Sequence, residues 1–95
     1  MTRLEASALN AMLLDVPDWR LEEEGDRILR TLKFRDFSEA FSFMARVALL
    51  AERMDHHPDW SNIYNRVEIA LTTHDAGGVT KNDIEMAKTI DGYVD

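Results

Sequence analysis

The chain has 95 residues, a formal net charge of −7, no cysteine and a hydrophobic fraction of 45%. This length fits a single domain over residues 1–95, and the hydrophobic fraction is that of a folded globular chain. The acidic charge argues against binding to nucleic acid or to anionic lipid, because both need basic groups opposite phosphate. The lack of cysteine excludes disulfides, thiolate metal sites and cysteine nucleophiles.

Two further absences bear on location. No apolar run approaches the roughly 20 residues that a membrane span requires. The first ten residues, MTRLEASALN, lack the apolar core and cleavage site of a signal peptide. We therefore expect a cytoplasmic protein that does not enter a membrane.

The first third of the chain predicts a helix followed by a hairpin. Thr2 and Glu5 have the spacing of a capping box, and Pro17 marks the end of the helix or the loop after it. From Trp19 the pattern changes to a period of two, which is typical of a strand, and Glu24–Asp26 has the composition of a turn. A second strand follows, with Ile28, Leu32 and Phe34 on one face and Leu29, Thr31 and Lys33 on the other.

The central segment predicts a long helix that begins at the cap Asp36–Glu39 and runs to about Asp55. It carries two apolar stripes: the first is Phe37, Ala40, Phe41, Met44, Ala48 and Ala51, and the second is Phe43, Val47, Leu50 and Met54. Because a helix on a single sheet needs only one apolar face, we predict that the second stripe packs against another subunit. The alternative is one broad stripe buried in the core of a monomer.

The last part of the chain predicts two strands and a final helix. After Pro58 come a short strand, a turn near Asn65 and Arg66, and a longer strand that alternates between Val67, Ile69, Leu71 and Thr73 on one face and Glu68, Ala70, Thr72 and His74 on the other. Asp75–Val79 is expected to form a loop, and Thr80 with Asp83 to cap the helix. The predicted fold is therefore α+β, a four-stranded antiparallel sheet with three helices packed on one face, in the order α-β-β-α-β-β-α.

The three histidines are the candidate chemical groups. His56 and His57 fall where the central helix must stop, and the nearby Glu52 and Asp55, with the helix C-terminus, favour the protonated imidazolium. His74 ends a strand, so two distant segments could bring three imidazoles to one cleft for proton transfer in both directions. Capping or surface histidines are the ordinary alternative. Zinc held by three imidazoles is another, although adjacent ligands suit one ion poorly.

These histidines belong to a longer motif whose order and spacing run without gaps. Its residues are Glu52, His56, His57, Pro58, Trp60, Asn62, Tyr64, Leu71, Thr73, His74, Gly78, Thr80 and Asp83. The segment FRDFSEAFSFM, Phe34 to Met44, adds the start of the central helix. With these residues the chain closely resembles the pterin-4a-carbinolamine dehydratase family, over at least Trp19 to Ala87.

The resemblance implies an enzyme and an assembly. Members of the family are hydro-lyases that remove water from 4a-hydroxytetrahydrobiopterin to give quinonoid dihydropterin, which recycles the cofactor of aromatic amino acid hydroxylases. They need no metal and no cofactor, since the pterin is the substrate. They commonly form homotetramers, dimers of dimers, in which sheets join edge to edge within a dimer and the central helices pack between dimers.

The resemblance also implies roles for individual residues. His56 and His74 become the candidates for general acid and base, in either order, and the third catalytic residue, His57, is expected to bind or orient the pterin. The implied substrate-binding residues are Glu52, Asp55, Pro58, Trp60, Thr73, Asp75, Ala76 and Asp83. Two of these have a purely structural alternative, because Trp60 could belong to the core and Asp83 could serve only as a helix cap.

Two other functions stay open at this point. Some animal members of the family act as dimerisation cofactors of a homeodomain transcription factor through the surface of the central helix. In this chain Phe43, Val47, Leu50 and Met54 would form that surface, a helix-in-groove interaction. A paralogue with weak activity in another pterin pathway is the second. The intact set of three histidines favours the enzyme.

Overall fold

The computed structural model describes residues 2–22 and 26–94 of the chain. The helices are α1 (Ala6–Leu13), α2 (Phe37–Met54) and α3 (Lys81–Gly92), with a short 3-10 turn, η1 (His74–Ala76), before α3. The strands are β1 (Arg20–Leu21), β2 (Ile28–Lys33), β3 (Asp59–Ile63) and β4 (Arg66–Leu71). The predicted order of elements is confirmed, while most of the predicted turn at Glu24–Asp26 lies outside the described residues.

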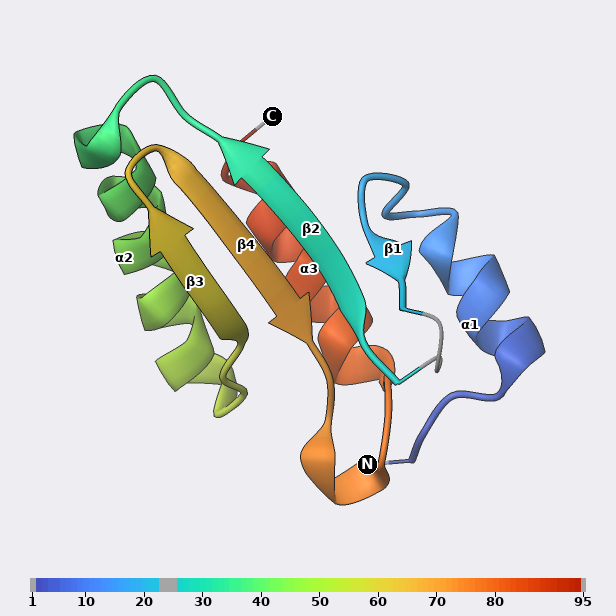
Figure 1. The fold of residues 1–95 in the computed structure, drawn as a ribbon. Coiled ribbons are helices and arrows are strands. Elements are labelled where there is room, and N and C mark those ends of the chain that lie inside the picture. The colour runs from blue at the N-terminus through green and yellow to red at the C-terminus, as the bar shows by residue number, and fades with distance from the viewer. Residues whose placement is uncertain (1, 23–25, 95) are drawn as a thin grey trace.

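The four strands form one antiparallel sheet in the order β1-β2-β4-β3. Figure 1 shows α2 and α3 behind this sheet, with α1 beside the short strand β1. The α+β fold class is therefore confirmed. The central pair, β2 and β4, is in register from Ile28 opposite Leu71 to Lys33 opposite Arg66, so the start of β2 lies beside the end of β4.

The alternating pattern of the strands decides which residues enter the core. Val67, Ile69 and Leu71 of β4 are fully buried, as is Ile28 of β2. Leu32 joins them on the same face, because successive side chains of a strand point to opposite sides of the sheet. These residues form a single apolar cluster with the inner faces of α2 and α3.

The prediction for the two stripes of α2 was wrong. Phe43, Val47 and Leu50 are buried in the core of this one chain, and Met54 packs against it half-buried. The exposed apolar face consists instead of Phe37, Phe41, Met44, Ala45, Ala48 and Leu49, with Phe41 57% and Leu49 69% exposed and Met44 half-buried. Periodicity gives the width of an apolar surface around a helix, but which arc meets the sheet depends on the rotation of the helix in the fold.

The predicted start of the first helix was also wrong. α1 begins at Ala6, its N-cap residue is Glu5, and no side chain caps it. The backbone N–H of Leu4 donates instead to the carbonyl oxygen of Val79, 2.9 Å away. A partner this distant in sequence is invisible to a local capping pattern, and it pairs the segment before α1 with the loop before α3. Among the described residues, no helix has the length and apolar character needed to cross a membrane.

We predict that Leu50→Ala lowers the free energy of unfolding by about 2–5 kcal/mol, because it leaves a cavity in the core. The matched control is Arg53→Ala on the exposed side of the same helix, which should change that free energy by no more than about 0.5 kcal/mol. Chemical denaturation measures both. Equal stability of Leu50→Ala and the wild type would place this side chain outside the core.

Candidate functional site

The buried carboxylate of Asp83 joins the segments that carry two of the histidines. Asp83 is 0% exposed and lies in the first turn of α3, where its Oδ2 accepts the backbone N–H of Thr80 at 2.8 Å. The same oxygen accepts the hydroxyl of Thr73 at 2.8 Å. Its other oxygen, Oδ1, lies 2.5 Å from Nε2 of His56. Asp83 is thus a helix cap, as predicted, and a partner of His56.

His56 is placed by the way in which α2 ends. Asp55 adopts the left-handed conformation, with φ 50°, and its backbone N–H donates to the carbonyl oxygen of Glu52. The N–H of His56 then donates to the carbonyl oxygen of Ala51 at 3.0 Å. These two bonds form a Schellman motif, which turns the chain back across the end of the helix. The His56 side chain is consequently only 11% exposed and reaches Asp83.

The contact with Asp83 fixes the role of each ring nitrogen of His56. An ionised carboxylate can only accept, so Nε2 of His56 carries the proton of this hydrogen bond. Nδ1 is then the nitrogen left for a substrate, an acceptor in the neutral ring and a donor in the imidazolium. An imidazole held in one tautomer by a carboxylate is the usual arrangement of a histidine that acts as a general base.

The neighbouring His57 has a different environment. Its Nε2 lies 2.9 Å from Oε1 of Glu52, but the two side chains are 59% and 79% exposed. A histidine–carboxylate contact this open to water contributes little to stability. The chain therefore holds two adjacent histidine–carboxylate pairs, one buried in a network and one at the surface.

His74 lies in an exposed turn that is closed by its own backbone. The N–H of Thr73 donates to the carbonyl oxygen of Gly78 at 3.0 Å, and the N–H of Gly78 donates to the carbonyl oxygen of Thr73 at 3.3 Å. Gly77 between them has φ 73°, a left-handed conformation that favours glycine. Because Thr73 directly precedes His74 and binds Asp83, the carboxylate ties the turn of His74 to the end of α2 that carries His56.

His74 also lines a cavity of about 270 Å³. The other lining residues are Asp26, Arg27, Asp59, Thr72, Gly77 and Gly78. His56 and His57 are not among them. The cavity lies where the start of β2 meets the end of β4, and the hydroxyl of Thr72 donates there to the carbonyl oxygen of Asp26 at 2.5 Å.

The remaining predicted site residues are dispersed around these groups. Asp55 is exposed and makes no ion pair within residues 2–22 and 26–94. Pro58 is half-buried, and Trp60 is half-buried and packs against the core from the helix side of β3. Asp75 is exposed in η1, and the half-buried Ala76 donates its N–H to Thr73 at 3.1 Å. Their contacts with a pterin stay predictions.

Sequence reasoning missed the residues that surround His74 in its cavity. Asp26 stood in a predicted turn and Asp59 between Pro58 and a predicted strand, with nothing in their spacing to join them to a histidine. Their proximity follows from the register of β2 and β3 against β4. The only available signal was that Asp59 follows Pro58 of the motif.

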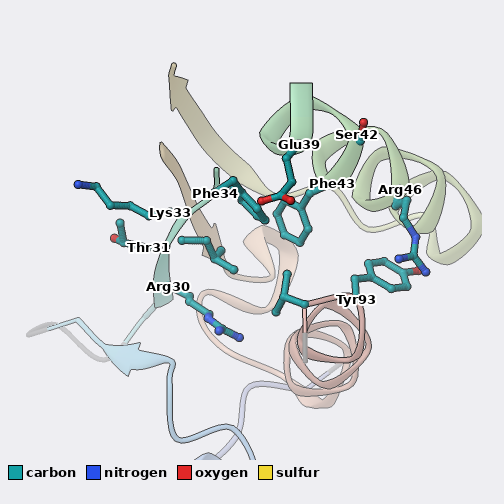
Figure 2. Close-up of a pocket in the computed structure, with 11 residues that line it drawn as sticks. Arg30, Thr31, Lys33, Phe34, Glu39, Ser42, Phe43, Arg46 and Tyr93 are labelled. Carbon is teal, nitrogen blue, oxygen red and sulfur yellow. The ribbon is translucent and has the colours of Figure 1, made fainter. Parts of the chain in front are cut away.

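A larger cavity, of about 590 Å³, lies elsewhere and contains no histidine. Figure 2 shows it between β2, the first half of α2 and the C-terminal residues, with Phe34 and Phe43 near each other and Arg46 beside Tyr93. The guanidinium carbon of Arg46 lies 4.0 Å from the centre of the Tyr93 ring, a cation–π contact. None of the predicted site residues lines this cavity. Within the described ranges, no three histidine or carboxylate side chains are grouped so as to hold a metal ion.

The chain matches the family model described as Pterin 4 alpha carbinolamine dehydratase over residues 2–93, and it belongs to this family. A relative from Mesorhizobium japonicum is 56% identical over 98% of this chain and 97% of its own length. One from Rhodospirillum rubrum is 54% identical over 97% and 96%. Both carry the name "Putative pterin-4-alpha-carbinolamine dehydratase".

A solved structure is similar over almost the whole chain. It is the crystal structure of a protein from Brucella melitensis described as a transcriptional coactivator/pterin dehydratase. Its TM-score is 0.95 at 45% identity, and the match covers 99% of this chain and 100% of that one. The family resemblance found in the motif is confirmed.

We predict that Asp83→Asn releases the His56 ring from its single tautomer. The amide can donate as well as accept, so it no longer forces the proton onto Nε2 of His56. The nitrogen chemical shifts of the His56 ring should then move toward a mixture of tautomers. The control is Glu52→Gln at the exposed pair, which should leave the His56 shifts in place. Wild-type shifts that already report a mixture would contradict the assignment.

Proposed function

We propose that this protein removes water from 4a-hydroxytetrahydrobiopterin and releases quinonoid dihydropterin. Family membership supports the reaction, as do the names of relatives that are about half identical over nearly the full chain. The observation that carries the proposal is the buried Asp83, which bonds to His56 and to the residue before His74.

The reaction needs one proton delivered and one removed. The C4a–O bond breaks as the leaving hydroxyl takes up a proton and departs as water. The N5–H proton leaves, and its electron pair forms the C4a=N5 double bond, so atoms and electrons balance without an oxidant. His56, through Nδ1, and the exposed His74 would supply the acid and the base. Imidazole suits both tasks because it titrates near neutral pH.

The other predicted residues would bind the substrate around these two histidines. His57, backed by Glu52, would orient the ring from the solvent side. Backbone N–H groups near Pro58 and from Thr73 to Ala76 can donate to the 4-carbonyl oxygen on the amide-like edge of a pterin. Because imidazoles serve both proton transfers, the proposed mechanism uses neither a metal ion nor a cofactor beside the pterin.

The proposed cellular role is recycling of the pterin cofactor of an aromatic amino acid hydroxylase in the cytoplasm. A hydroxylase regenerates its cofactor only if the hydroxylated pterin is dehydrated, which links the two activities. A gene for such a hydroxylase near that of this protein would support the role.

We predict that the wild type dehydrates synthetic 4a-hydroxytetrahydropterin and keeps this activity in EDTA. His56→Ala and His74→Ala should each lower kcat by roughly 10²-fold or more, the range for loss of a general acid or base. His57→Ala should act more on KM. Near-normal turnover in both single variants would refute the proton-transfer roles, and activity lost in EDTA but restored by zinc would point to a metal site.

We propose, further, a homotetramer built as a dimer of dimers through α2. The exposed apolar face of this helix supports it: Phe37, Phe41 and Leu49 are all large and largely open to water. Monomeric proteins rarely leave an apolar patch of this kind exposed to water. Packing the face against its own copy would cover it on both partners by one symmetric contact.

We predict that Leu49→Glu converts a wild-type tetramer to dimers, because it places a charge in the proposed contact. The control Asn10→Glu adds the same charge at an exposed position of α1 and should stay tetrameric. Light scattering measures both. A monomeric wild type, or a tetrameric Leu49→Glu, would exclude this face as the contact. Leu50, which the sequence placed in the stripe expected between subunits, is unsuitable for this test because it is 2% exposed in the core.

A second function is favoured by one finding, the description of the Brucella melitensis structure as a transcriptional coactivator as well as a pterin dehydratase. The exposed face of α2 would be the surface that docks an amphipathic helix of a transcription factor. Such a partner would compete with self-assembly for Phe41 and Leu49. The dehydratase reaction stays the first proposal, since the histidine network lies outside this face.

A further inference from the structure

One carboxylate oxygen of Asp26 has no hydrogen-bond partner beside the cavity that this residue shares with His74. Its Oδ1 is buried and lacks a hydrogen bond, alone among the buried side-chain nitrogen and oxygen atoms of residues 2–22 and 26–94. Buried carboxylates are costly unless donors surround them. The backbone at this position is nevertheless held, because Thr72 donates to the carbonyl oxygen of Asp26. The residue is thus held by its main chain, while one oxygen of its carboxylate, Oδ1, is buried without a hydrogen bond.

The basic neighbour of Asp26 is occupied by other carboxylates. Arg27 donates through Nη2 to Glu22 at 2.8 Å and through Nε to the second oxygen of Glu22 at 3.2 Å. This bidentate bond raises the pKa of Arg27, and Asp59 and Asp26 raise it further through their charges. Asp59 is the next carboxylate, 3.9 Å from Nη1. With Arg27 held by Glu22, the cavity has an excess of acceptors.

A cavity with this excess suits a ligand edge that carries N–H donors. The pyrimidine half of a pterin has such an edge, formed by the exocyclic 2-amino group and the adjacent ring N3–H. The two parallel donors match the two oxygens of one carboxylate. Because Oδ1 of Asp26 makes no hydrogen bond, the carboxylate can turn toward the cavity without breaking a hydrogen bond at this oxygen. The volume of about 270 Å³ is near the lower end for small-molecule pockets, about 300 Å³.

We propose that Asp26 is a specificity-determining residue that binds the 2-amino and N3–H edge of the pterin. The inference rests on the proposed function. It places the pyrimidine end of the pterin at Asp26. C4a and N5 lie on the side of the ring away from the 2-amino group. Holding that group at Asp26 turns C4a and N5 away from this carboxylate, in a cavity that His74 also lines. The reaction itself does not need Asp26.

The test compares two stable ligands, 6-methylpterin and 6-methyllumazine. The lumazine carries an oxygen in place of the 2-amino group of the pterin. Titration of tryptophan fluorescence gives Kd for each. The wild type should prefer the pterin by roughly tenfold or more, and Asp26→Asn should weaken pterin binding by roughly 10- to 100-fold and remove the preference. Asp15→Asn, an exposed residue remote from the cavity, is the matched control and should keep the wild-type Kd values.

Thermal unfolding separates this role from a structural one. Because Oδ1 is buried without a hydrogen bond, Asp26→Asn should unfold at a temperature equal to or above that of the wild type. Weaker binding of both ligands together with a lower Tm would overturn the proposal, as would an unchanged preference or a wild type that binds no pterin. Turnover in the wild type with an unchanged KM in Asp26→Asn refutes this inference alone. Asp26-dependent binding without turnover refutes only the proposed reaction.

Discussion

A carboxylate without access to water must be surrounded by donors, and Asp83 meets this demand with groups from three segments. The backbone of Thr80 comes from the N-cap of α3, the hydroxyl of Thr73 from the segment just after β4, and the ring of His56 from the turn that ends α2. Removing one donor would leave buried charge uncompensated, so the three segments are held together. The position of the proposed catalytic groups depends on this one side chain, which also caps the N-terminus of α3.

The sheet supports this arrangement and leaves one helix face unused. Fully buried residues of β4 pack under α2 and α3, which fixes where α2 ends and therefore where His56 emerges. The same packing turns Phe37, Phe41 and Leu49 outward. The proposed site and the proposed assembly surface thus lie on one helix, at its C-terminal end and along its outer face. A charge on the outer face can therefore alter assembly without touching the histidine network.

Much of the fold could be read from local patterns. The caps of α2 and α3 are correctly predicted because Asp36 and Asp83 bond to backbone groups within three residues. The alternation of Val67, Ile69 and Leu71 is correct for the same reason, since strand geometry is local. Two predictions failed where the partner was distant. Leu4 donates its backbone N–H to Val79 and does not belong to the first turn of α1. The rotation of α2 buries Phe43, Val47 and Leu50 in the core and leaves Phe41 exposed.

The sequence by itself determined the family, the order of elements and the three histidines, because these depend on residue types and short spacings. Only the tertiary structure decided which histidine is paired in a buried site and which is exposed to water. It also brought Asp26 to the cavity of His74, through the pairing of β2 with β4. Burial and hydrogen bonding between distant segments arise from packing in three dimensions, and two adjacent residues such as His56 and His57 can therefore have opposite environments.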